Sequence, residues 1–107
     1  MIVEYIRYSI AAASADDFVA GYRAAAASLD ASPHCLSYEL TRCAEDPQLF
    51  TLRIVWDSME GHLQGFRKGP HFGAFFAAIK PYVGNILEMQ HYEPTAVARD
   101  KREAATA

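Results

Sequence analysis

The chain has 107 residues, a formal net charge of −3, and 51% apolar against 21% charged residues. This length suits a single domain, and this balance of residues excludes a largely disordered chain. Lysine and arginine are scattered along the sequence, and no apolar run approaches the roughly 20 residues that span a bilayer. We therefore expect neither a nucleic-acid-binding protein nor a membrane protein.

The first predicted element is a strand over residues 2–10. Isoleucine or tyrosine occupies each even position except Glu4, and this period of two is typical of a strand with one buried face. The first six residues show no cationic stretch followed by an apolar run, so we expect no signal peptide.

A helix is predicted to follow, beginning at Ser14. The Ser14 hydroxyl can cap free backbone amides, and Asp16 and Asp17 would lie at the positive end of the helix dipole. The apolar residues at helical spacing are Phe18, Tyr22, Ala25 and Leu29. Ser32 and Pro33 end the helix.

Residues 36–41 and 50–56 are predicted to form an antiparallel hairpin. In both segments apolar side chains alternate with polar ones, and Glu45-Asp46-Pro47 between them is typical of a turn. Cys35 and Cys43 would lie about 26 Å apart along the first strand at about 3.3 Å per residue, too far for a disulfide. Their spacing fits no metal site, so we expect a protein of the reducing cytoplasm.

Two short helices are predicted between Ser58, which can start the first, and Gly84. The residues at i, i+3, i+4 and i+7 on one face of the first helix are Met59, His62, Leu63 and Phe66. Gly69 breaks the chain, and Pro70 would occupy the first position of the second helix. The apolar residues of that helix are Phe72, Phe75, Phe76 and Ile79. Pro81 and Gly84 close it.

A final strand is predicted over residues 86–93. Leu87 and Met89 would form its apolar side, with Ile86 on the polar side. The tail, residues 94–107, is polar and rich in alanine, and we expect it to be either frayed or docked on a partner.

The order β-α-β-β-α-α-β predicts an α+β protein with the split βαβ, ferredoxin-like arrangement as one domain over residues 1–93. Its four-stranded antiparallel sheet would carry helices on one face only. The residues expected on the bare face are Tyr5, Arg7, Ser37, Glu39, Thr51, Arg53 and Val55. Two such faces can cover each other, so we expect a two-fold homodimer.

Several segments together resemble the antibiotic biosynthesis monooxygenase family. They are "RIVWDSMEGHLQGFRKGPHFGAFFAAI" with "EMQHYE", the opening "MIVEYIRY", and "HCLSYEL", and the likeness covers nearly all of residues 1–93. The resemblance implies a dimeric α+β barrel with a cleft in each subunit between the sheet and the paired helices. Family members oxidise quinol-type or polycyclic aromatics with molecular oxygen, many without metal or flavin, so we expect neither a cofactor nor a metal site.

Two departures from the family pattern concern histidines. Members often carry a histidine one turn before the glycine-proline break, where this chain has Phe66 and places His62 a turn earlier. Relatives that degrade haem use a histidine of the second helix as iron ligand. The matching position here is Phe76, and no histidine follows in that helix. This second departure argues against haem as the natural ligand.

His62 and His71 are the candidate catalytic histidines, each with a structural alternative. His62 is either a half-buried histidine satisfied by a backbone carbonyl or a base that takes the phenolic proton of a quinol. His71 lies in the first turn of a helix, where the dipole favours a neutral imidazole. It either orients a ligand oxygen or serves the fold, whereas His34 and His91 are expected to be structural or solvated.

Aromatic residues complete the predicted site. Trp56 is either a core residue or, as we favour, a catalytic wall residue with its indole N–H directed at the ligand. Tyr38 either reaches the substrate or bonds a neighbouring backbone group. The phenylalanines expected to build the core and line the cleft for a flat substrate are Phe66, Phe72, Phe75 and Phe76.

The sequence thus favours a cofactor-independent monooxygenase that oxidises a quinol or fused-ring aromatic with molecular oxygen. The alternative is a homodimer of the same fold that binds a small molecule or haem without catalysis. A fold resemblance alone does not decide between them.

Overall fold

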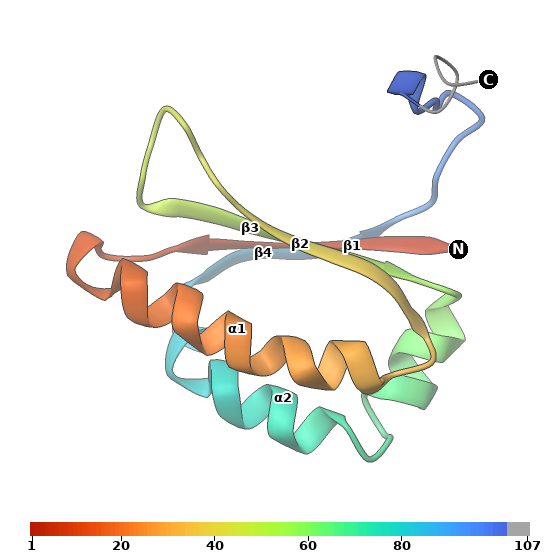
Figure 1. Ribbon diagram of the computed structural model, residues 1–107, viewed down its shortest axis with the longest axis horizontal. Coiled ribbons are helices and arrows are strands. Elements are labelled where there is room, and N and C mark those ends of the chain that lie inside the picture. Colours follow the sequence, from red (N-terminus) through yellow and green to blue (C-terminus); the bar gives the residue numbers. More distant parts are fainter. Residues whose placement is uncertain (103–107) are drawn as a thin grey trace.

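The computed structural model describes residues 1–102 and confirms the predicted α+β, ferredoxin-like class (Figure 1). The strands are β1 (Ile2–Ser9), β2 (Cys35–Arg42), β3 (Leu49–Trp56) and β4 (Ile86–Tyr92). The helices are α1 (Ala15–Ala31) and α2 (Phe72–Ile79), the π-helix η2 (Gly61–Phe66), and the 3-10 turns η1 (Ala12–Ser14) and η3 (Lys80–Asn85).

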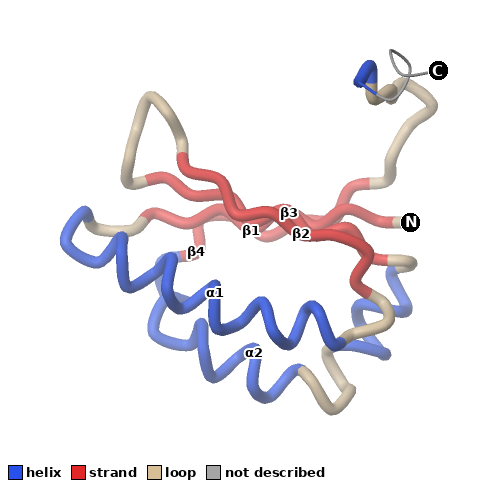
Figure 2. Tube along the Cα trace, in the orientation of Figure 1, coloured by secondary structure: helices blue, strands red, loops and turns tan. Residues whose placement is uncertain are grey.

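The four strands form one antiparallel sheet in the order β2-β3-β1-β4. Both α1 and α2 lie on the same face of this sheet, and the segment after β4 leaves on the opposite side (Figures 1 and 2). The opposite face is thus free of both helices, as predicted, although Val55 is only 6% exposed within the single chain. The expectation that Val55 would be bare is therefore wrong, because its neighbours already cover it.

Helix α1 packs on the sheet through the face that its periodicity predicts: Phe18, Tyr22, Ala25 and Leu29 are all buried. The Phe18 ring contacts Tyr8, Phe50 and Tyr82, with ring centroids 4.9 to 5.1 Å apart. The buried hydroxyls of Tyr8 and Tyr22 hydrogen-bond to each other, so neither is buried without a hydrogen-bond partner.

Two predicted helix starts differ from the structure. Ser14 precedes α1, but its side chain makes no capping hydrogen bond. The turn η1 leads directly into the helix and holds Ser14 at φ −103° and ψ −1°, away from the extended conformation typical of a cap. Pro70 does not begin α2, because a turn with Gly69 N–H donating to Phe66 O at 3.0 Å delays the helix to Phe72.

Strand β4 differs from the prediction in the side that Ile86 faces. A register shift between Arg7 and Tyr8 places Ile86 opposite Tyr8, with Met89 opposite Ile6 on the helix-covered side. Leu87, predicted to be on the apolar side, is 56% exposed. One extra residue in a strand reverses which side chains face inward beyond it. The inward and outward side chains of residues 86–89 therefore do not alternate strictly.

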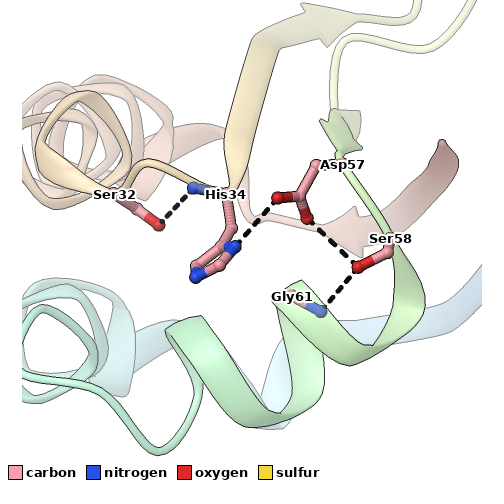
Figure 3. Close-up of polar contacts among 5 residues, drawn as sticks. All are labelled: Ser32, His34, Asp57, Ser58 and Gly61. Atoms are coloured by element: carbon pink, nitrogen blue, oxygen red, sulfur yellow. Dashed lines mark hydrogen bonds and ion pairs between the residues drawn. The ribbon is translucent and has the colours of Figure 1, made fainter.

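The turn between β3 and η2 is held by a small polar cluster (Figure 3). His34 Nδ1 lies 2.9 Å from Asp57 Oδ2, and the Asp57 amide donates to His34 O at 2.9 Å. The Ser58 hydroxyl oxygen accepts from Gly61 N–H at 2.8 Å, which confirms Ser58 as the start of this helical segment. The cluster joins the beginning of β2 to η2.

Gly65→Ala should destabilise the protein by about 1–3 kcal/mol, because a methyl group there would overlap the His34 ring. The ring must then move and lose its bond to Asp57. Urea denaturation measures the cost. In the double variant His34→Ala, Gly65→Ala the penalty of the alanine should largely vanish.

The matched control for this variant is Gly73→Ala in α2, where an added Cβ meets no atom within 4 Å. There we expect a gain of about 0.5–1 kcal/mol from helix propensity. An equal effect at both glycines would show that His34 does not restrict η2.

Candidate active site

A cavity of about 300 Å³ lies between the sheet and the η2–α2 segment. Its walls are largely apolar and aromatic, and its lining includes Ile6, Tyr8, Ile54, Trp56, Phe66, Phe72, Phe75, Phe76, Ile79, Ile86 and Met89. Glu4, His62 and Arg67 also line it. An apolar cavity with a few polar groups is the usual form of a small-molecule site, and its aromatic walls suit a flat ring.

The polar end of the cavity is a cluster of four side chains, Glu4, Trp56, His62 and His91. The Trp56 indole N–H donates to Glu4 Oε1 at 3.1 Å, and His62 Nε2 lies 3.5 Å from the same oxygen. His91 Nε2 lies 2.8 Å from His62 Nδ1 and 3.8 Å from Glu4 Oε2. The Trp56 and His62 rings are stacked with centroids 4.4 Å apart.

Each of these side chains comes from a different element. Glu4 shares the even-numbered face of β1 with Ile6, and the sheet register places His91 of β4 directly opposite it. Trp56 ends β3, at the point where the chain turns toward η2. His62 belongs to η2, where Arg67 N–H donates to His62 O at 2.9 Å, an i→i+5 bond.

Not all the side chains expected on the inner face of this segment face inward. His62 is 4% and Phe66 2% exposed, whereas Met59 is 40% exposed although α-helical spacing predicts all three on one face. The wide turn does not explain the exposure of Met59, because Met59 precedes η2 and His62 N–H donates to Ser58 O at 3.1 Å in an ordinary i→i+4 bond. His62 is thus buried more deeply than the half-buried position expected from its sequence.

Burial favours the uncharged form of both Glu4 and His62. It raises the pKa of the Glu4 carboxyl, opposed by the Trp56 hydrogen bond and by the Arg67 charge. It lowers the pKa of His62 to about 4, helped by His91 and Arg67, and burial also lowers the pKa of His91. Although His62 lies at ion-pair distance from Glu4, we regard their contact as one between a neutral imidazole and a carboxyl group.

Two neutral imidazoles in contact must share one hydrogen between them. When His91 Nε2 donates to His62 Nδ1, the hydrogen of His62 lies on Nε2 and faces Glu4. When His62 Nδ1 donates instead, its Nε2 lone pair is available beside the cavity. The pair can therefore pass a proton between the buried carboxyl group and His91, whose side chain is 20% exposed.

Most predicted site residues line this cavity, but two do not. Trp56, His62 and the four phenylalanines lie along it, although the Trp56 indole N–H donates to Glu4 and is not directed at a ligand as predicted. Tyr38 lies in a separate groove beside α1, where its hydroxyl donates to Asp30 Oδ1 at 2.7 Å. His71 is at the N-terminal end of α2 and is not among the lining residues. The structure therefore does not bring Tyr38 or His71 together with His62.

Three residues of the site were not foreseen from the sequence: Glu4, His91 and Arg67. Glu4 carried a signal, because it is the one carboxylate on an otherwise apolar strand face, and it is only 2% exposed. His91 was expected to be structural or solvated, and the structure places it in contact with His62 and near Glu4. Nothing in the sequence marked Arg67 as a site residue, because exposed arginines at the end of a helical segment are common.

In the described part of the chain, residues 1–102, no helix has the length and apolar character needed to cross a membrane.

Comparison with known proteins gives a consistent result. Residues 1–78 match the family model described as antibiotic biosynthesis monooxygenase. The chain is 21% identical over 77 residues to the uncharacterized protein YczJ of Bacillus subtilis strain 168, covering 72% of this chain and 81% of YczJ.

Solved structures share the fold. A candidate antibiotic biosynthesis monooxygenase from Bordetella bronchiseptica superposes with a TM-score of 0.71 at 24% identity, covering 88% of this chain and 96% of that chain. The Rv0793 protein of Mycobacterium tuberculosis gives a TM-score of 0.73 at 17% identity, covering 92% and 98%. At such identities these structures establish the fold alone.

Proposed function

Since this chain belongs to the antibiotic biosynthesis monooxygenase family, we propose that it oxidises a quinol or a fused-ring phenol with molecular oxygen, without a metal or flavin cofactor. The observation that carries this proposal is the apolar, aromatic-lined cavity of about 300 Å³ with a buried carboxyl–imidazole pair at one end. A cavity of this kind can hold a flat ring, exclude water and accept a phenolic proton in the same place.

The proposed reaction needs no reductant other than its substrate. One O–H and one C–H bond of the phenol break, and a new C=O bond forms at the ring carbon. One atom of O₂ enters the product, and the second leaves as water with the two hydrogens. All four electrons that O₂ requires come from the ring, so a phenol becomes a quinone.

The residues of the cluster would act on the first step, removal of the phenolic proton. Glu4 and the Nε2 atom of His62 are the acceptors that line the cavity, and a carboxylate with a raised pKa is a stronger base than an ordinary one. His91 would pass the proton outward. Arg67 would stabilise the electron-rich phenolate that O₂ attacks.

Oxygen uptake by protein freed of metals tests this function. With a panel of hydroquinones and fused-ring phenols, we expect one O₂ consumed per quinone formed and no hydrogen peroxide. Peroxide equal to the oxygen consumed would mean simple oxidation without oxygen insertion, and would contradict the proposal. Tight binding of a panel compound without uptake above the uncatalysed rate would favour the alternative, a non-catalytic binding protein.

We also propose that the helix-free face of the sheet forms a two-fold homodimer. Thr51 lies on β3 opposite Arg7 of β1, on the face that also carries Arg53, so Thr51→Arg would add bulk and a third arginine to this face. We expect the variant to be monomeric by light scattering, whereas wild type is dimeric. Ala77→Arg on the exposed side of α2 should remain dimeric. A monomeric wild type would exclude the dimer.

A further inference from the structure

Glu4, His62 and His91 together have the donor atoms of a metal site. Each offers one nitrogen or oxygen atom, and these atoms all lie within 4.8 Å of one another. We propose that this cluster binds a divalent first-row transition-metal ion, with one carboxylate and two imidazoles as protein ligands. Two histidines and one carboxylate are a ligand set that such ions accept. This inference goes beyond the proposed function, which needs no metal.

The donor atoms of the cluster lie near one another, although not all are at the separations that one bound ion requires. Bonds of about 2.0–2.1 Å at tetrahedral or octahedral angles separate neighbouring ligand atoms by roughly 2.9–3.4 Å. His62 Nδ1 lies 2.8 Å from His91 Nε2, whereas His62 Nε2 lies 3.5 Å from Glu4 Oε1. His91 Nε2 lies 3.8 Å from Glu4 Oε2. These contacts involve both nitrogens of His62 and both oxygens of Glu4, whereas one ion takes one atom from each residue. One atom from each can be chosen so that all three lie within 4.8 Å of one another, and side-chain rotations would bring them to the required separations.

The surroundings favour a cation with open coordination positions. The Trp56 indole N–H holds Glu4 Oε1 at 3.1 Å and so leaves Oε2 for the ion, a second layer of contacts that orients ligands in metal sites. Glu4 is 2% exposed and would supply one negative charge to the ion when it loses its proton on binding. Because Glu4 and His62 line the cavity, ligand positions not filled by protein would face the substrate space.

Arg67 is the charged group that opposes this site. Its guanidinium acts electrostatically on Glu4, His62 and His91 alike, so it would weaken the binding of a second cation. Removing the Arg67 charge is therefore expected to change the metal affinity in one direction, which a purely structural cluster would not predict. Arg67→Gln should bind the metal more tightly than wild type.

Metal binding and the proposed proton transfer would exclude each other. An ion at the cluster occupies the lone pairs of Glu4 and His62 that would accept the phenolic proton. Adding the metal ion to metal-free protein is therefore expected to inhibit oxygen uptake. The two proposals can fail separately, since the absorption of the bound metal is measured without any substrate.

The test is titration of chelator-treated protein with Co²⁺, followed by the visible absorption of the bound ion. Wild type should bind one equivalent, and His91→Ala and Glu4→Gln should bind at least about 10–100-fold more weakly. The controls His34→Ala and His71→Ala, at histidines outside the cluster, should bind as wild type. No cobalt band in wild type, or a band that persists in His91→Ala and Glu4→Gln, would overturn the inference.

Discussion

Glu4→Gln is expected to lower kcat/KM for oxygen uptake by about 10²-fold or more, the usual loss when a general base is removed. The amide keeps the size of the side chain and an oxygen that can accept from Trp56, which now donates to Glu4 at 3.1 Å. It cannot accept a proton from the substrate. The loss should therefore appear mainly in kcat, measured with an oxygen electrode.

The stability of the same variant separates chemistry from folding. Glu4 is 2% exposed, and burying a charge is unfavourable, so glutamine should leave the free energy of unfolding unchanged or slightly higher. His71→Ala should keep its activity, because His71 does not line the cavity. Full activity in Glu4→Gln would remove Glu4 from the mechanism and leave His62 as the acceptor.

Phe18→Ala is expected to cost about 3–5 kcal/mol of unfolding free energy, the range for a buried phenylalanine. Phe18 is 0% exposed, and its ring contacts four others, those of Tyr8, Tyr22, Phe50 and Tyr82. Its removal would leave a void between α1 and the sheet. The total stability of small domains is about 5–15 kcal/mol, so this change should bring the protein close to unfolding.

Urea denaturation followed by tryptophan fluorescence measures this cost, because the single tryptophan, Trp56, is 0% exposed in the fold. Val97→Ala is the control: Val97 is 93% exposed and lies outside the sheet, so its loss should stay within about 0.5 kcal/mol. A cost below about 1 kcal/mol for Phe18→Ala would mean that the core closes over the missing ring.

Local patterns in the sequence determined the elements of this protein. Alternation over residues 2–10, 36–41 and 50–56 and the helical spacing from Phe18 to Leu29 each predicted the element that the structure contains. These patterns work because a strand or helix shows its buried face within a few neighbouring residues. The order of the elements then limited the fold to the ferredoxin-like class, and the family motifs agreed with it.

Departures from regular geometry were not predictable from the same patterns. The register shift that brings Ile86 inward and the i→i+5 bond from Arg67 to His62 both add a residue to a regular repeat. Such insertions are decided by packing against the rest of the chain, and the sequence around them still reads as a regular strand or helix. Ile86 is therefore on the opposite face of its strand from the one predicted.

The composition of the candidate site was also decided by tertiary structure, because its residues come from distant parts of the chain. Trp56, His62 and the phenylalanines could be proposed from one continuous stretch of sequence, whereas Glu4 and His91 lie far from it along the chain. They meet His62 only because β1 and β4 pair in the register that places residue 4 opposite residue 91. The sequence alone determined the kind of fold and one wall of the cavity. Strand pairing joins residues that are distant in the sequence, and it decided that Glu4 and His91 complete the polar end of the cavity.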